Sequence, residues 1–372
     1  MKVLHVTPAY APNIGGIEVL LSYLLPALEA KHGVHSAVCV GSPNVWTEEF
    51  EHHGVSREIE QGVFVVRFGR FSTRSSSELA KILRLNSALR EVFAEFQPDV
   101  VHIHGPSRLA NGAYRIANVS NIPLVLHVHG DIAVPESFGR LCKETETVIA
   151  PSEFLARILA TKFGRTKTTL VCPNGLPTAA FTLPSSQSQA GVLRLLAAGR
   201  LEHNKGFDIA IHSVSLLRDW GLLTSMVLYG EGPEAEALAR LAQSLEVETL
   251  VEFRRPVAHE NLLREMSRAD VVVVPSRELE GFGLVAAEAS AIGKPVVVCD
   301  TGGLPEAVIH DVTGIVVPPD DPTALARALV DLHNDEVFRV EMARRAREFA
   351  QQNFSLGAMC DRLFEMYSGV SC

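Results

Sequence analysis

Short apolar runs alternate with amphipathic segments along the whole chain, and this alternation predicts strands and helices in turn. The clearest case is residues 271–306, where Val271–Val274 and Val296–Cys299 are continuous apolar runs, as is typical of parallel strands covered on both faces. Ligands of such sheets bind outside the carboxyl ends of the strands. Glu280 and Glu288, on the loop and helical stretch between these runs, are therefore candidates for a binding site.

Further apolar runs extend the pattern over both halves of the chain. A Ser-, Gln- and Pro-rich stretch at residues 178–191 separates the two series and is predicted to be a linker. We therefore predict an α/β protein of two doubly wound parallel-sheet domains that face each other, residues 1–177 and 192–353. The strands are predicted at residues 3–7, 35–40, 63–68, 100–104, 124–129, 148–150 and 170–172 in the first domain and at 193–198, 226–229, 250–253, 271–274 and 296–299 in the second.

A pair of glycines, Gly15 and Gly16, lies where the first strand gives way to a helix that begins near Ile17. The N–H groups and positive dipole end of such a helix suit a phosphate or carboxylate, and a tight turn that requires glycine is the alternative. Pro26 is expected to kink or end this helix. Three more helices are predicted near the end of the chain, at residues 320–332, 335–351 and 354–367.

Length and composition agree with two soluble globular domains. The chain has 372 residues, of which 47% are apolar and 21% charged. The net charge of −9 is uneven, because residues 1–190 hold 17 basic and 16 acidic residues and the remainder holds 17 and 27. This distribution argues against a general nucleic-acid-binding protein and permits an anionic surface or acceptor at the first half.

The cysteines and the amino-terminal residues indicate a cytoplasmic location. Six cysteines are scattered without a C-x-x-C pair, which fits a reducing compartment. Residues 1–10 have one Lys and a short apolar run that leads into a turn, so we interpret them as a first strand and not as a signal peptide. No apolar run reaches the ~18 residues that a membrane span requires.

Residues 67–90 form a basic segment with six cations and one acid, Glu78. Apolar residues at helical spacing run from Leu79 to Phe96, so a solvated charged face above a core-facing stripe explains the segment. The alternative is a contact with an anionic membrane or acceptor, which would make the protein peripheral at the inner face of the membrane.

Two His-x-His pairs end neighbouring predicted strands: His102 with His104, and His127 with His129. Metal binding is not predicted, because neither pair has an adjacent carboxylate or Cys set. A histidine at the carboxyl end of a parallel strand is better placed to contact a ligand or to act as an acid or base. A structural role is the alternative for His102 and His127.

Two cations, Arg200 and Lys205, flank a loop that follows the first strand of the second half. Such a pair at a strand end suits a diphosphate, and solvated surface cations are the alternative. Gly230-Glu231-Gly232 follows the next strand, but this G-x-G alone is a weak dinucleotide signal.

Taken together, these stretches resemble the retaining nucleotide-sugar glycosyltransferases of family 4, which have the GT-B fold of two Rossmann-like domains facing a cleft. The resemblance covers nearly the whole chain. It implies that the last helix, within residues 354–372, crosses back to the first domain. The motifs that carry it are Gly15-Gly16-Ile17-Glu18, His129-Gly130, Pro173-Asn174-Gly175, Gly199-Arg200, Lys205-Gly206, Gly230-Glu231-Gly232-Pro233, Pro275-Ser276, Glu280 to Glu288, and Gly302-Gly303 with Glu306.

The resemblance also implies roles in binding the sugar donor. Arg200 and Lys205 would bind the diphosphate, and Glu288 would accept hydrogen bonds from ribose hydroxyls. Glu280 would lie beside the transferred sugar. The backbone amides that would hold phosphate and sugar belong to Gly281, Phe282, Gly283 and Leu284.

On the acceptor side the resemblance implies Gly15, Gly16, His104 and His129. Gly16 would let the backbone approach the diphosphate, and His129 would contact a sugar hydroxyl or the reaction centre. Arg254 occupies the loop that usually borders the base, where the family often has glycine, so the role of Arg254 and of Arg255 beside it stays open.

The expected reaction uses a nucleotide-diphosphate sugar, UDP- or GDP-linked, and a hydroxyl acceptor of unknown type. The chain has no D-x-D motif to hold a divalent ion, so no metal or cofactor is expected and fixed cations with helix N-termini would neutralise the leaving group. The resemblance implies that the anomeric configuration is retained. No carboxylate is an obvious nucleophile, which favours front-face transfer.

Three other functions remain as alternatives. A sugar-nucleotide epimerase or a phosphorylase could use the same fold, and so could a binding protein that has lost catalysis. A nicotinamide oxidoreductase is disfavoured because G-x-G-x-x-G does not follow the first strand.

Overall fold

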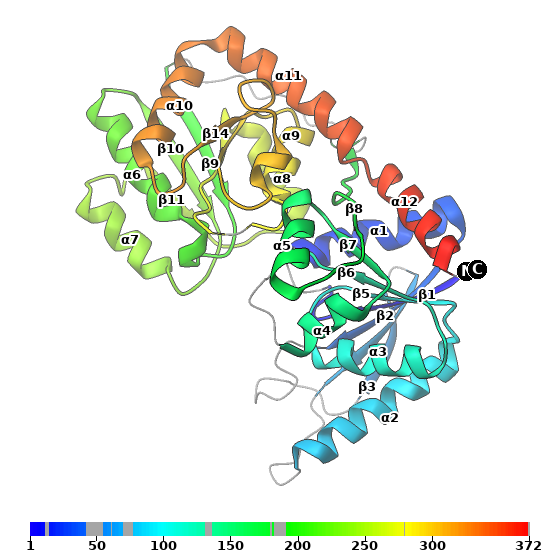
Figure 1. Ribbon diagram of the computed structural model, residues 1–372. Coiled ribbons are helices and arrows are strands. Elements are labelled where there is room, and N and C mark those ends of the chain that lie inside the picture. The colour runs from blue at the N-terminus through cyan, green and yellow to red at the C-terminus, as the bar shows by residue number, and fades with distance from the viewer. Residues whose placement is uncertain are drawn as a thin grey trace. The chain divides into compact units, whose positions relative to one another are not determined.

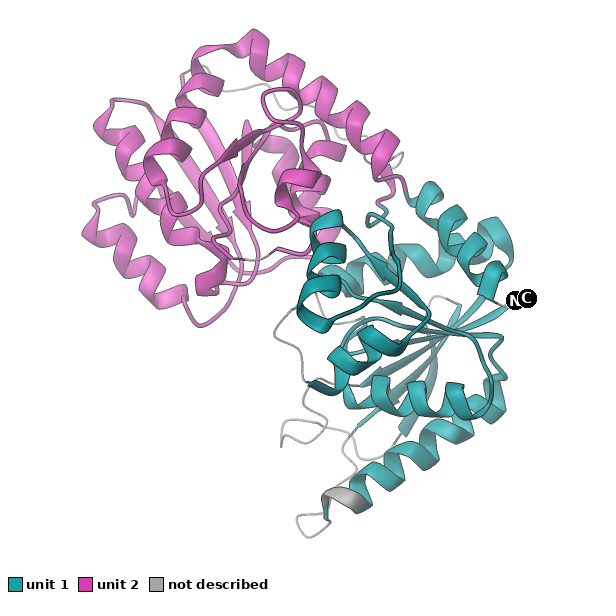
Figure 2. Cartoon of the chain, in the orientation of Figure 1, with its two compact units in different colours: residues 1–175, 356–372 teal, residues 176–355 magenta. Residues whose placement is uncertain are grey.

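A computed structural model describes residues 1–11, 15–41, 55–60, 62–69, 77–130, 136–178, 181, 191–278 and 280–370. The chain forms two compact units (Figure 2). Unit 1 comprises Met1–Gly175 together with Leu356–Cys372, and unit 2 comprises Leu176–Ser355. Of the predicted linker, residues 178–191, the structure describes Thr178, Phe181 and Gly191, and the rest lies outside the described residues.

The described part of unit 1 contains an eight-stranded sheet in the order β3-β4-β2-β1-β5-β6-β7-β8 (Figure 1). All neighbours are parallel except β3 and β4. The strands that follow β1 in the chain are added on one side of it, and those that follow β5 are added on the other side of the sheet. The topological switch point therefore lies between β1 and β5. The strands are β1 Lys2–Thr7, β2 His35–Gly41, β3 Val55–Glu60, β4 Val63–Phe68, β5 Val100–Ile103, β6 Leu124–His127, β7 Thr147–Ala150 and β8 Thr169–Val171.

Helices cover both faces of this sheet. One face packs against α1 and α12, which bury Leu24 and Leu363 among others, and the opposite face packs against α2 to α5. The last helix is therefore part of the core of unit 1, as the resemblance implied. The helices are α1 Gly16–His32, α2 Glu78–Phe96, α3 Arg108–Val119, α4 Glu136–Glu144, α5 Glu153–Phe163 and α12 Leu356–Val370.

Pro26 does not end the first helix. The helix α1 continues to His32, where Gly33 adopts a left-handed φ of 63° and donates its N–H to Glu29. Pro26 lies on the exposed side, whereas Leu24 and Leu28 on either side of it are buried. Burial of an apolar side chain contributes roughly 1.5–3 kcal/mol, so these contacts offset the hydrogen bond that proline cannot donate.

Unit 2 contains a six-stranded parallel sheet among its described residues, in the order β11-β10-β9-β12-β13-β14. Its switch point lies between β9 and β12. The strands are β9 Leu193–Ala198, β10 Thr224–Tyr229, β11 Val251–Arg254, β12 Val271–Val274, β13 Val296–Cys299 and β14 Ile315–Val317. The helices are η2 His203–Lys205, α6 Phe207–Asp219, α7 Ala235–Ser244, α8 His259–Arg268, α9 Leu284–Ala291, η3 Leu304–Ala307, α10 Pro322–Asn334 and α11 Glu336–Asn353.

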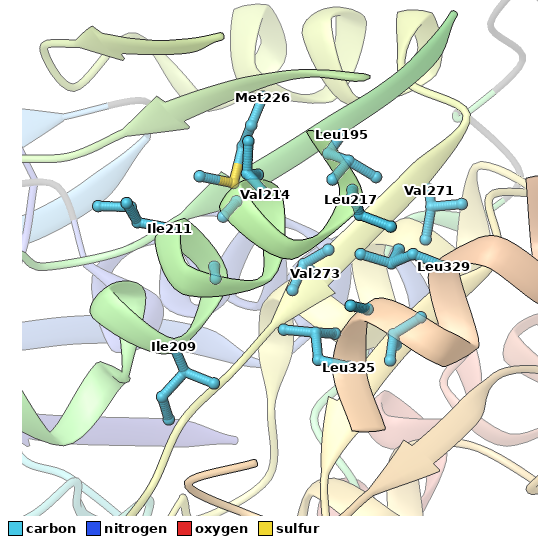
Figure 3. Close-up of a cluster of buried hydrophobic side chains, with 14 of the residues drawn as sticks. Leu195, Ile209, Ile211, Val214, Leu217, Met226, Val271, Val273, Leu325 and Leu329 are labelled. Atoms are coloured by element: carbon cyan, nitrogen blue, oxygen red, sulfur yellow. The ribbon is translucent and has the colours of Figure 1, made fainter. Parts of the chain in front are cut away.

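The core of unit 2 shows why these elements form. Figure 3 shows Leu217 of α6 and Leu329 of α10 packed over Leu195 of β9 and Val273 of β12. The second face of the sheet packs against α8, α9 and α11. The strands β12 and β13 are therefore buried on both sides, as their unbroken apolar runs predicted.

Several element bounds differ from the predictions. The edge strand β3, with the exposed sequence VSREIE, and the three-residue β14 were not predicted, because neither has a long apolar run. The helices α10 and α11 begin at Pro322 and Glu336, slightly later than the predicted starts at 320 and 335. Asp321 and Asp335 act instead as N-caps, because their side chains accept hydrogen bonds from the N–H groups of Ala324 and Phe338. Among the described helices, none combines the length and the apolar character that crossing a bilayer requires.

Candidate functional site

In unit 2, the loops after β9, β12 and β13 converge at the carboxyl edge of the sheet. Gly206, after η2, has φ of 65°, and a Cβ atom there would lie 2.0 Å from the carbonyl oxygen of Pro275. Gly302, with φ of 62°, would place a Cβ atom 2.4 Å from the backbone nitrogen of Glu280. The three loops therefore touch through two positions that accept only glycine.

Lys205 and Glu280, predicted on separate loops, form an ion pair at this edge. The Nζ atom of Lys205 lies 2.9 Å and 2.7 Å from the two carboxylate oxygens of Glu280. The hydroxyl of Ser276 donates to Glu280 at 3.3 Å, and the N–H of Gly303 donates to its carbonyl oxygen at 2.7 Å. Each charged side chain keeps 22% exposure, so the pair is accessible to a ligand.

The other predicted cation, Arg200, has different contacts. Its side chain is 75% exposed and pairs with Glu202 at 3.1 Å. The structure thus brings Lys205 together with Glu280 and leaves Arg200 on the surface of the same loop region.

The predicted backbone segment, Gly281 to Leu284, leads into α9. Gly283 is the N-cap, with φ of 88°, and Leu284 is the first helical residue. The first N–H groups of a helix have no partner within it, so they are available to an anion. The ring of Phe282 is buried and meets the ring of Phe354 edge-on, with 5.2 Å between the centroids, so this side chain anchors the segment in the core of unit 2.

Glu288 lies in α9 and is 4% exposed. Its carboxylate is 2.8 Å from Nε2 of His259, at the start of α8. His259 was not predicted as a site residue, because no motif spacing links it to α9 and the contact arises from the packing of two helices.

Arg254 is held by residues of its own unit. It contacts Glu252 at 2.7 Å, the hydroxyl of Tyr229 at 2.7 Å and Glu265 at 3.3 Å. The hydrogen bond that Arg254 donates to Glu252 raises the pKa of its guanidinium above the ordinary value. The side chain is therefore a fixed cation at the end of β11.

Arg277 is a second site neighbour that sequence reasoning missed. Its guanidinium donates to Asp208 at 2.7 Å, to Asp320 at 2.8 Å and to the carbonyl of His203 at 2.9 Å. The hydrogen bond to Asp208 is the main reason that its pKa is raised. Arg277 thus ties the loop after β12 to the one after β9, a role hidden in sequence because its partners come from three segments.

In unit 1, the predicted glycines lie at the start of α1. Gly15 is the N-cap, with an extended φ of −168°, and Gly16 is the first helical residue. The N–H groups of this first turn lie beyond the end of β1, beside the switch point.

Five histidines gather at the same switch point of unit 1. His5 of β1 joins the two predicted pairs, and the register aligns His5 with His102. Burial lowers the pKa of His5 to about 3 and that of His129 to about 4, and it also holds the pKa values of the other three well below their ordinary range. All five are neutral near pH 7. His5 was missed because it lies inside an apolar run.

The histidines are close enough to be considered as metal ligands. Two trios of ring nitrogens, His5 with His102 and His104, and His104 with His127 and His129, lie within 4.8 Å. Linear spacing did not reveal this arrangement. However, His104 is hydrogen-bonded on both sides, its Nε2 lying 2.9 Å from Nδ1 of His5 and its Nδ1 lying 3.1 Å from Nε2 of His129. These contacts occupy lone pairs that a metal would need, and the absence of a metal stays a prediction.

The whole chain is similar in structure and sequence to known glycosyltransferases. A structure of HepE from Anabaena with UDP and glucose matches with a TM-score of 0.78 and 22% identity, covering 99% of each chain. This similarity confirms the predicted GT-B fold. The glycogen synthase of Mycobacterium tuberculosis is 29% identical over 99% of this chain and 94% of its own. The D-inositol 3-phosphate glycosyltransferase of Jonesia denitrificans is 30% identical over 79% of each.

Two family models match consecutive parts of the chain. The model described as Glycosyltransferase Family 4 covers residues 14–180, and the one described as Glycosyl transferases group 1 covers residues 183–352. The protein is therefore a glycosyltransferase enzyme, and the chain belongs to glycosyltransferase family 4.

Proposed function

We propose that the protein transfers a hexose from a nucleotide-diphosphate sugar to a hydroxyl acceptor, with unit 2 binding the sugar donor and unit 1 contributing acceptor-side groups. One observation carries this proposal: the accessible ion pair of Lys205 and Glu280 at the β9/β12 switch point, next to the N-terminus of α9. A cation, a carboxylate and helix amides together suit a sugar diphosphate.

Charge neutralisation would come from the protein. Lys205, Arg200 and the amides of residues 281–284 would bind the diphosphate as its bond to the anomeric carbon breaks. The chain contains no D-x-D motif, which supports a metal-independent reaction.

Transfer would proceed on the front face with retention of configuration. The acceptor oxygen forms a bond to the anomeric carbon on the side that the diphosphate leaves, and a phosphate oxygen takes the acceptor proton. Glu280 supports this route because both of its oxygens contact Lys205, which disfavours nucleophilic attack by the carboxylate.

Glu288 would bind the ribose hydroxyls, and His259 would orient Glu288 through their 2.8 Å contact. UDP-glucose is the first sugar donor to test, because HepE has the same fold and binds UDP and glucose. GDP-mannose is the second, since either base fits the proposal.

The decisive experiment combines UDP-glucose, GDP-mannose or ADP-glucose with a panel of glucan and inositol acceptors. Transfer should occur in EDTA, and NMR of the product should show the anomeric configuration of the sugar donor. Conversion of the sugar donor without any acceptor would favour an epimerase, and inversion in the product would refute the front-face step. Stabilisation by a nucleotide sugar without turnover of any acceptor would favour a binding protein.

Membrane contact through residues 67–90 remains a second proposal. Arg84 and Arg90 are exposed on α2 beside the exposed Leu83, which supports it. Arg67 counts against it, since its guanidinium pairs with Glu58 and Glu60 of β3, and Arg70 and Arg74 lie outside the described residues. Vesicles with phosphatidylglycerol should sediment the protein, and Arg84→Glu should release it, while pure phosphatidylcholine vesicles serve as the control.

A further inference from the structure

A chain of side-chain contacts crosses four adjacent strands of unit 1, from β2 through β1 and β5 to the end of β6. The hydroxyl of Ser36 lies 3.4 Å from Nε2 of His5. Nδ1 of His5 lies 2.9 Å from Nε2 of His104, and Nδ1 of His104 lies 3.1 Å from Nε2 of His129. In both His5 and His104, Nε2 contacts the group nearer β2 and Nδ1 contacts the group nearer β6.

The direction of one hydrogen bond in this chain determines all of the others. A neutral imidazole has one N–H group that donates and one nitrogen that accepts. The three rings are neutral because burial lowers their pKa values far below neutrality. If one ring carries its proton on Nδ1, the next ring must accept on Nε2 and must also carry its proton on Nδ1.

Asn174 sets the direction at the His129 end. Asn174 is 3% exposed, and its Oδ1 atom and Nδ1 of His129 are both buried with no hydrogen-bond partner among the described residues. Asn174 interacts with His129 in the sense that favours the protonated ring, as an accepting amide oxygen does. An N–H group on Nδ1 of His129 that donates to the Asn174 oxygen would satisfy both buried atoms.

The other two histidines pack against the rings of this chain. His127 stacks on His129 with ring centroids 3.8 Å apart, and His102 lies 4.0 Å from His104 and contacts the hydroxyl of Tyr367 at 2.6 Å. Both rings are fully buried, so they keep water from the sides of the linked histidines. The hydrogen bonds between the rings are then the main polar contacts available to His104.

We propose that Ser36, His5, His104, His129 and Asn174 form a one-way hydrogen-bond chain in which all three rings are Nδ1–H tautomers. Ser36 donates to His5, His5 to His104, His104 to His129, and His129 to Asn174. Ser36, His5 and His104 are then positioning residues for His129. Of the ring nitrogens in these three histidines, Nδ1 of His129 alone would then donate outside the row of rings. An acceptor or sugar hydroxyl would have to displace Asn174 to reach this buried N–H group, and this last step rests on the proposed function.

Long-range ¹H–¹⁵N correlation spectra of the ¹⁵N-histidine-labelled protein at pH 7.5 test the chain directly. Protonated and unprotonated ring nitrogens have well separated ¹⁵N shifts, so the tautomer of each ring is read without substrate. The expected result is Nδ1–H for all three rings. A single Nε2–H ring among His5, His104 and His129 would overturn the proposal, and so would displacement of the His104 signals by one equivalent of Zn²⁺, which would identify a metal site.

A mild variant tests whether the chain transmits its direction. Ser36→Ala removes the first hydrogen bond at a partly exposed strand position, and the ¹⁵N shifts of His104 and His129 should change. Ser120→Ala, at the C-cap of α3, is the matched control and should leave them unchanged. Unchanged His129 shifts in Ser36→Ala would refute transmission. Because these spectra require no turnover, failure of the proposed function would leave this result intact, and the two failures are distinguishable.

Discussion

The Nζ atom of Lys205 contacts both carboxylate oxygens of Glu280, although 75 residues separate them in sequence. Each follows a different strand of the unit 2 switch point. We expect Lys205→Ala and Glu280→Ala each to reduce transfer by at least about 100-fold, since the proposed function places both groups at the reacting sugar diphosphate. Initial rates with saturating nucleotide sugar measure this effect.

The control for these variants is Arg240→Ala, which breaks the exposed pair with Glu236 in the same unit. Its rate should match the wild type. All three variants should keep nearly the same melting temperature, because partly exposed ion pairs contribute little stability. Normal turnover in both Lys205→Ala and Glu280→Ala would show that the site has been misassigned.

His259 is expected to control affinity for the nucleotide. In His259→Leu the buried carboxylate of Glu288 loses its partner, and a hydrogen bond to a charged group is worth about 1.5–3 kcal/mol. The dissociation constant for the nucleotide, measured by calorimetry, should rise about 10-fold or more. His259→Gln keeps a donating group and should recover part of the affinity, and His212→Gln on α6 should have no effect. Equal affinity in His259→Leu would exclude the orienting role.

Gly206 is expected to be irreplaceable because of the contact with Pro275. In Gly206→Ala the new Cβ atom would overlap the carbonyl oxygen of Pro275, in addition to the strain of a positive φ. Gly221 has φ of 78° and open space around it, so Gly221→Ala isolates the strain alone. We expect Gly206→Ala to lower both melting temperature and transfer rate, and Gly221→Ala to cost only about 1 kcal/mol of stability. Similar behaviour of the two variants would mean that the loops can separate freely.

The buried histidines should make unit 1 sensitive to acid. Their pKa values are lowered in the folded chain, so between pH 6.5 and about 4 unfolding takes up protons that the folded state does not bind. Their stabilising contribution is therefore fully present above about pH 6.5 and is lost as the pH falls, by about 1.4 kcal/mol per pH unit for each proton. Urea unfolding at pH 7.5, 6.0 and 5.0, followed by circular dichroism, measures this slope.

His127→Leu separates the histidines from the carboxylates, which also titrate in acid. Both ring nitrogens of His127 are buried without a hydrogen-bond partner among the described residues, so leucine removes one titrating group at little structural cost. The dependence of stability on pH should become shallower in this variant. An unchanged slope would show that His127 does not remain neutral in the folded state.

Sequence patterns predicted the sheets well because buried parallel strands are continuous apolar runs. The family resemblance implied that Lys205 and Glu280 both serve the sugar donor, but the contact between them was not predicted, because it depends on the order of the strands in the sheet. Sequence patterns did not predict β3, whose sequence is charged and exposed, or β14, which has only three residues, because neither forms a long apolar run.

The missed site residues have a common physical reason. His259 reaches Glu288 through the packing of two helices, and Arg277 binds groups on three separate segments. His5 is hidden within an apolar run, and its alignment with His102 depends on strand order. Contacts of this kind are set by tertiary structure, and local spacing carries no information about them.

The placement of α12 has a consequence for biosynthesis. Leu363 and Tyr367 are fully buried in the core of unit 1, although that unit otherwise ends at Gly175. Because a ribosome adds residues from the amino terminus onward, every residue of unit 2 is made before this helix. Synthesis of unit 1 thus begins before that of unit 2 and is completed after it. A nascent chain stalled before residue 356 would carry a finished unit 2 and a unit 1 sheet face that α1 alone covers.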